Sequence, residues 1–247
     1  MTVRAQQPGA PPIYLRVADE LERAMSAQEA GSPLASENEL ALSYGVSRLT
    51  ARAALEELER RFLVRRSQGR RAFVARRIEY NVGPDTAPSW TQTVLAGGGV
   101  PRSETVILRL RRAPASVRAA LELSKTREAL FLARERYVDD ELSAYAETWL
   151  AADVVPDLDT TLGANGSLYD AFESSYRLQP ARARSRAEFV VASAPIARKL
   201  RIDGRPMLFR LDGQTDSGRL RRPIEMTTSW LRADIFRIVF ALERGRP

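Results

Sequence analysis

Apolar residues near the start of the chain recur at every fourth position, which predicts an amphipathic helix over residues 13–27. A Gly-Ser-Pro sequence then breaks the pattern, so this first helix ends before it. The residues that form the apolar stripe are Ile13, Val17, Leu21 and Met25.

Two further helices follow closely. Ser36 and Glu39 have the spacing of a capping box, and Gly45 is suited to end the short helix that they begin. Ser47 is a suitable N-cap for the next helix. The inward stripe of that third helix consists of Ala51, Ala54, Leu55 and Leu58.

Two helices joined by the tight turn at Gly45 and Val46 predict a helix-turn-helix, whose second helix presents its N-terminal residues to base edges in the major groove. Short apolar runs at 63–64 and 73–74 flank a polar tip and predict a small hairpin, or wing. Arginines on this wing would lie near phosphates or the minor groove: Arg65, Arg66, Arg70 and Arg71.

The rest of the chain changes to a strand pattern. Residues 78–92 contain glycine and prolines and are expected to form a linker or an ordered loop. Beyond them, apolar and polar residues alternate in several segments, with a turn at 139–141 and short helices at 114–123 and 167–176. A second domain over residues 93–247, of the α+β class with a mostly antiparallel sheet, is therefore expected behind an N-terminal α/β winged helix-turn-helix domain over residues 1–77.

Charge strengthens the nucleic-acid interpretation of the first domain. The chain of 247 residues has a net charge of +7, and residues 48–77 alone carry ten arginines against three glutamates. Such a concentrated excess is the electrostatic footprint expected of a nucleic-acid face. A solvated, arginine-rich helix in a chain with only two lysines is the alternative explanation.

The chain contains neither His nor Cys, which removes the imidazole base, the thiolate nucleophile and Cys/His metal sites. No catalytic residue, metal or cofactor is expected. The sequence also shows no long apolar run and no signal peptide, so a cytoplasmic protein without a membrane partner is expected.

Residues 13–75 resemble the winged-helix domain of GntR-family bacterial transcription regulators. The family's Leu-Pro-Ser-Glu-x-x-Leu, Gly-Val-Ser-Arg-x-Thr, Arg-x-Ala-Leu and Gly-Arg-Gly patterns are matched in order by LASENEL, GVSRLT, RAALEELER and QGRRAF. Ala35, Asn38 and Arg71 depart from the family's usual Pro, Arg and Gly at these positions. The DNA-contacting residues that the resemblance implies are Ser36, Asn38, Ser47, Arg48, Thr50, Arg52, Gln68, Gly69, Arg70 and Arg71.

The second half resembles the UTRA ligand-binding domain of the HutC branch of this family, which has a chorismate-lyase-like fold. The matching segments are ARERYVDDELSAYAETWL, SLYDAFESSYRLQPARARSRAEF and RRPIEMTTSWLRADIFRIVF. Guanidinium groups, hydroxyls and a helix N-terminus suit a phosphate or carboxylate, although a solvent-facing ladder of ion pairs would show the same alternation. The effector-binding residues that the resemblance implies are Ser89 and Thr91 in a loop, with Arg134, Arg136, Glu147, Ser167, Tyr169, Glu188 and Glu225.

The sequence thus predicts a dimeric repressor that binds a near-palindromic operator and responds to a small anionic effector. A phosphorylated sugar or amino sugar suits the arginines and hydroxyls, and the segment IEYNVGPDTAPSWTQ is similar to the linker of regulators of phosphonate use. Two alternatives remain open at this point. One is a non-specific architectural DNA-binding protein, and the other is an enzyme of lyase-like fold.

Overall fold

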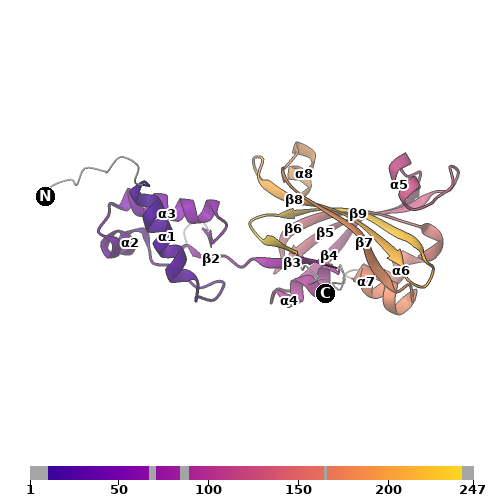
Figure 1. Ribbon diagram of the computed structural model, residues 1–247, viewed down its shortest axis with the longest axis horizontal. Helices are drawn as coiled ribbons and strands as arrows, with labels where there is room; N and C mark the ends of the chain where they lie inside the picture. Colours follow the sequence, from indigo (N-terminus) through magenta and orange to yellow (C-terminus); the bar gives the residue numbers. More distant parts are fainter. Residues whose placement is uncertain (1–10, 67–70, 84–88, 164–165, 241–247) are drawn as a thin grey trace, which may run out of the picture. The chain divides into compact units, whose positions relative to one another are not determined.

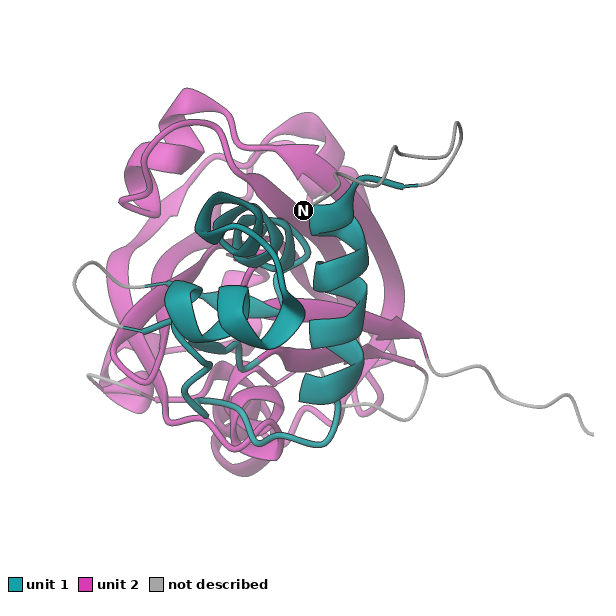
Figure 2. Ribbon diagram, turned by 90° about the vertical axis from the view of Figure 1, so that its left-hand side faces the viewer, with its two compact units in different colours: residues 1–76 teal, residues 77–247 magenta. Residues whose placement is uncertain are grey.

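The structure is a computed structural model that describes residues 11–66, 71–83, 89–163 and 166–240. The chain divides into two compact units, Met1–Arg76 and Arg77–Pro247, which are coloured teal and magenta in Figure 2. Each unit has its own hydrophobic core. No helix in the described residues has the length and apolarity needed to cross a membrane.

The first unit is a three-helix domain with a short hairpin. The apolar stripes predicted for the first and third helices meet in one core, where Ala51, Ala54 and Leu58 have no exposed surface. Strands β1 and β2 pair antiparallel, as predicted for a wing. The elements are α1 (Ile13–Met25), α2 (Glu37–Tyr44), α3 (Arg48–Arg60), β1 (Val64–Arg65) and β2 (Phe73–Val74).

Side chains at the helix ends explain where α2 and α3 begin. The Ser36 hydroxyl accepts a hydrogen bond from the Glu39 backbone N–H, and the Glu39 carboxylate accepts one from the Ser36 N–H at 2.6 Å. This is the predicted capping box. Gly45 follows α2 with φ +62°, a left-handed conformation that glycine adopts without strain. Ser47 then caps α3, so only three residues separate the helices.

The second unit is built on a six-stranded sheet in the order β4-β5-β6-β9-β8-β7, in which every neighbouring pair is antiparallel (Figure 1). The predicted α+β class with a mostly antiparallel sheet is confirmed. The sheet strands are β4 (Pro101–Arg111), β5 (Ala129–Val138), β6 (Glu141–Leu150), β7 (Pro180–Val191), β8 (Met207–Ser217) and β9 (Arg222–Arg232).

Each face of this sheet carries its own layer. One face, called here the inner face, packs against α4, α6, α7 and the strand pair β3 and β10, while α8 packs on the other, called the outer face (Figure 1). Helix α5 lines a hollow on the outer face. The remaining elements are α4 (Trp90–Ala96), α5 (Ala115–Ala120), η1 (Ala152–Val154), α6 (Leu158–Leu162), α7 (Leu168–Asp170), η2 (Ala171–Ser175) and α8 (Ala194–Lys199).

The predicted linker at 78–92 is instead largely ordered structure where it is described. Residues Ile78–Val82 form β3, which pairs in parallel with β10 (Phe236–Phe240) from the other end of the chain. Trp90 then begins α4. Pairing between segments that are so distant in sequence leaves no local signal, which is why the glycine and prolines alone suggested a loop.

Candidate functional site

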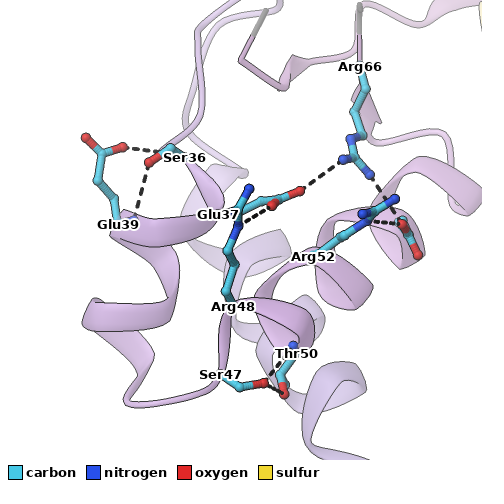
Figure 3. A network of polar contacts seen from close by, with 9 residues as sticks. Ser36, Glu37, Glu39, Ser47, Arg48, Thr50, Arg52 and Arg66 are labelled. Atoms are coloured by element: carbon cyan, nitrogen blue, oxygen red, sulfur yellow. Dashed lines mark hydrogen bonds and ion pairs between the residues drawn. The ribbon is translucent and has the colours of Figure 1, made fainter. Parts of the chain in front are cut away.

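The predicted recognition helix begins with polar side chains that hold one another. The Ser47 hydroxyl accepts from the Thr50 N–H at 3.1 Å, and the two side-chain oxygens lie 2.8 Å apart (Figure 3). Arg48 and Arg52 extend from the same first turns and are exposed. The N-terminal end of α3 thus carries the hydroxyl and guanidinium groups that a base-reading helix needs.

Residues from α2, α3 and the wing form one hollow surface. Four of the predicted DNA-contacting residues line it, and Glu37 and Arg66 lie between them. Since its exposed cations are arginines, this surface suits a polyanion. The four predicted residues are Ser36, Asn38, Arg48 and Arg71. The predicted wing residues Gln68, Gly69 and Arg70 lie outside the described residues.

One arginine of the basic stretch 48–77 has a structural role instead. Arg61 donates to Asp19 at 2.7 Å and to Glu22 at 2.8 Å on α1, and its Nε donates to Glu57. These carboxylates raise its pKa, Asp19 most. The high arginine content therefore overstates the charge available to DNA, because Arg61 ties α3 to α1.

A second polar cluster lies on the inner face of the sheet in the other unit. Tyr169 donates to Glu225 at 2.7 Å, and the Thr215 hydroxyl donates to the same carboxylate oxygen at 2.5 Å. Glu225 is only 2% exposed. Burial, with the charge of Glu225 beside it, raises the pKa of Tyr169 well above its usual value. Tyr169 therefore remains a neutral donor at physiological pH.

Three arginines approach this cluster from two strands. Arg134 is 4% exposed and donates to the Gly166 carbonyl at 2.7 Å. Burial lowers its pKa to about 9, with a further contribution from Arg136. Burial also lowers the pKa of Arg136, whose guanidinium lies 5.4 Å from the centroid of the Trp90 ring. Burial opposes the charge of Arg182, but Tyr169, Tyr80 and Glu225 together raise its pKa.

The guanidinium groups of this cluster are not fully satisfied. Within the described part of the chain, the Nε atoms of Arg134 and Arg136 are buried and have no hydrogen-bond partner. A buried donor without a partner costs on the order of 1–3 kcal/mol, and more when it is charged. An anionic ligand that accepted these hydrogen bonds would remove that cost, so the cluster is a candidate anion site.

The structure does not bring all of the predicted effector residues to this cluster. Glu147 and Glu188 lie on the outer face, where Glu147 pairs with Lys199 at 2.6 Å and Glu188 with Arg210 at 3.4 Å. Their side chains are on the opposite side of the sheet from Arg134 because they stand out of phase with it in the strand pairing. For these two glutamates, the ion-pair ladder is the arrangement that the structure shows.

The remaining predicted effector residues lie at helix starts on the inner side. Ser89 was expected in a loop, but it caps α4 by accepting from the Gln92 N–H, and Thr91 lies inside that helix. Ser167 caps α7 through the Asp170 N–H at 3.2 Å, as the sequence suggested. Within the described residues, no group of acidic side chains could hold a metal ion.

Comparison with known proteins agrees with both halves of this architecture. Residues 13–74 match the model of bacterial regulatory proteins of the gntR family, and residues 96–237 match the UTRA domain. The chain belongs to the GntR family. It is a DNA-binding transcription regulator with a UTRA effector-binding domain.

Three similar proteins illustrate the family. The HTH-type transcriptional regulator GgaR of Escherichia coli K12 is 31% identical over 235 residues, which is 94% of this chain and 91% of GgaR. A probable fructoselysine utilization operon transcriptional repressor of the same organism is 25% identical over 95% of this chain and 93% of its own. The crystal structure of PhnF from Mycobacterium smegmatis superposes with a TM-score of 0.64 at 26% identity, over 92% of this chain and 99% of PhnF.

The UTRA domain of this GntR regulator also contains site residues that the sequence did not single out. Tyr80 on β3 and Thr215 on β8 belong to the inner cluster, and so does Arg182 on β7. Arg182 lies so close over Gly213 that a Cβ atom there would overlap its Nη1. The run Ala-Arg-Ala-Arg-Ser-Arg contained a signal, namely three arginines in alternation, but it could not say which of them faces inward.

Proposed function

We propose that this regulator is a dimeric repressor that leaves a near-palindromic operator when a small phosphorylated sugar, amino sugar or phosphonate binds the inner cluster of its UTRA domain. The observation that carries the proposal is the pair of buried, unpartnered Nε atoms of Arg134 and Arg136. The cluster contains three guanidiniums, and the carboxylate of Glu225 interacts with two of them, Arg136 and Arg182. A dianion such as a phosphate group suits that excess of positive charge.

Support for repression comes from a relative, since the fructoselysine protein is named as a probable repressor of its operon. A two-fold dimer of winged helices would read two half-sites, so its operator would be nearly palindromic. The base-reading contacts proposed for it come from Ser47, Arg48, Thr50 and Arg52 on α3, with Ser36, Asn38, Arg71 and the wing tip in support.

The proposed coupling between ligand and DNA begins at Tyr80. A small cavity of about 30 Å³ lies beside Arg182 and is lined by Tyr80 and its neighbours on β3. That volume holds only about two water molecules, so a phosphorylated sugar can enter this cavity only if the lining moves. Because β3 begins two residues after the first unit ends, its displacement acts directly on the chain that leads to the DNA-binding domain.

Fluorescence anisotropy on DNA from upstream of the protein's own gene, against a scrambled duplex at about 150 mM salt, tests the proposal. We expect operator DNA to bind at least about 10³-fold more tightly than scrambled DNA. N-acetylglucosamine 6-phosphate, glucosamine 6-phosphate and 2-aminoethylphosphonate then serve as ligand probes, with uncharged N-acetylglucosamine as the matched control. Release of operator by a phosphorylated probe but not by the uncharged sugar supports the account.

Two other outcomes would favour the alternatives. Equal affinity for both duplexes would favour a non-specific architectural protein. Chemical turnover of a probe by the full-length protein would favour an enzyme.

A further inference from the structure

Glu37 connects the recognition helix to the wing. It is the first residue of α2, and its two carboxylate oxygens accept from different elements (Figure 3). The Nε of Arg48 on α3 donates to Oε2 at 3.0 Å, and the Nη2 of Arg66, next to β1, donates to Oε1 at 3.2 Å. The Glu37 side chain is 20% exposed, whereas that of Arg48 is 69% exposed. The carboxylate thus lies beneath the guanidinium that it holds.

The same arrangement continues along α3. Glu56 lies 3.6 Å from the Nη1 of Arg66 and accepts from the Nε of Arg52 at 2.9 Å. Five side chains therefore alternate in charge in a continuous series of ion pairs, in the order Arg48, Glu37, Arg66, Glu56 and Arg52 (Figure 3). Arg48 and Arg52, both exposed and both proposed to contact bases, stand at the two ends.

Carboxylates are unfavourable on a surface proposed to bind a polyanion, because they repel phosphates and weaken non-specific binding. Their benefit is geometric. An arginine side chain loses rotamer entropy when it is ordered, and a carboxylate that holds its Nε fixes the plane of the guanidinium before DNA binds. The Nη groups that read guanine can then reach a base edge without a further ordering cost.

We propose that Glu37 is a positioning residue for sequence recognition, which orients Arg48 and Arg66 together and thereby raises the ratio of operator affinity to random-DNA affinity. This inference rests on the proposed function, in which Arg48 reads bases. A carboxylate that weakens random-DNA complexes by its charge, while it strengthens the operator complex by orienting Arg48, is a way to gain specificity.

Glu37→Gln in the full-length protein separates positioning from simple charge. The substitution removes a negative charge from the DNA-facing surface, so electrostatics alone would tighten binding to every duplex. The proposal predicts the opposite sign for operator. Operator affinity falls about tenfold, which is within the discrimination expected from one bidentate arginine, while affinity for scrambled DNA stays the same or rises.

Glu59→Gln is the matched control, because Glu59 is an exposed residue near the far end of α3 and the change in charge is the same. It should alter operator and scrambled affinity by the same factor. Glu37→Asp is the second test, because it keeps the charge on a side chain one methylene shorter. It should leave scrambled affinity at the wild-type level and reduce operator affinity.

Three results would overturn the proposal. The first is that Glu37→Gln tightens both complexes as Glu59→Gln does. The second is that Glu37→Gln weakens both complexes equally, which would mean that Glu37 only supports the fold at the start of α2. The third is full operator affinity in Glu37→Asp. Arg48→Ala distinguishes these results from a failure of the proposed function, since loss of selectivity in that variant shows that Arg48 reads bases whatever Glu37 does.

Discussion

Tyr169 donates its hydroxyl hydrogen to Glu225 across 2.7 Å, and the two residues come from elements on either side of the interior of the second unit. Tyr169 lies in the short helix α7, whereas Glu225 lies on β9, one of the two central strands of the sheet. Their hydrogen bond ties the helical layer to the sheet at the candidate anion site. Tyr169 therefore links the helical layer to the sheet at the place where the proposed ligand would bind.

Tyr169→Phe should lower the free energy of unfolding of this unit by about 1–2 kcal/mol, because Glu225 loses one of two hydroxyl donors while it stays buried. Urea unfolding followed by tryptophan fluorescence measures this, since all three tryptophans lie in the second unit. Tyr176→Phe is the control, because its hydroxyl bonds the Pro156 carbonyl at a more exposed position. An unchanged transition in Tyr169→Phe would contradict the assigned role.

Arg182→Gln should abolish the release of operator by a phosphorylated probe, because it removes one of the three cations of the inner cluster. Arg184→Gln removes the same charge two residues away but on the outer face, so its response should remain that of the wild type. Anisotropy titrations of the operator complex with the probe compare the two variants. A response lost in both, or kept in both, would argue against an anion site on the inner face.

Arg48→Ala and Arg52→Ala should each cost on the order of 1–3 kcal/mol of operator affinity and relax sequence preference, provided that these side chains reach base edges. Competition binding with duplexes that carry single base changes in the operator measures both effects. The expected signature is a larger loss on operator than on scrambled DNA. Comparable losses on both would reassign the residue to phosphate contact.

The capping box should make the first unit sensitive to acid. Hydrogen bonding from the Ser36 backbone, with its side chain and Arg71 also contributing, lowers the pKa of Glu39 from its usual 4.5. A carboxylate whose pKa is lower in the folded state stabilises the fold above its unfolded pKa, and that contribution is lost as the pH falls through the folded value. The melting temperature of the helical first unit should therefore fall when the pH is lowered below roughly 5.

Glu39→Gln is the comparison for this effect, since glutamine keeps a side-chain acceptor for the Ser36 N–H but does not titrate. Circular dichroism melts of both proteins at pH 7 and at about pH 3 give the test. The wild type should be the more stable protein at neutral pH, and the difference should shrink at the lower pH. A difference that is constant with pH would show that the carboxylate charge contributes nothing.

How much the sequence could predict depended on how local the signals were. The helix starts at Ser36 and Ser47 were predicted correctly because a capping residue and its partner lie within three positions of each other. Helix ends without such a signal were predicted less accurately. The first helix, for example, ends at Met25 rather than at residue 27. Strand β3 was missed altogether, because its partner β10 lies at the other end of the chain.

At the candidate anion site, the sequence was equally unable to predict which face of the sheet each side chain would occupy. Alternation in a strand says which residues share a face, but it does not say which face is covered. Arg134, Tyr169 and Glu225 were therefore predicted together with Glu147 and Glu188, although the last two point the other way.

Arg182 illustrates a further difficulty. A register shift between Arg182 and Arg184 puts one opposite Thr215 and the other opposite Gln214, so two arginines that the alternation would place on one face lie on different faces. A bulge of this kind cannot be recognised in the sequence alone.

The most direct test of the account is whether ligand and operator exclude each other by the same factor. Isothermal calorimetry would measure the affinity of the phosphorylated probe for the free protein and for the protein saturated with operator. Since coupling between two binding sites is reciprocal, we predict that the probe binds the operator complex more weakly, by the same factor by which it weakens operator binding. Equal probe affinity with and without operator would contradict the account.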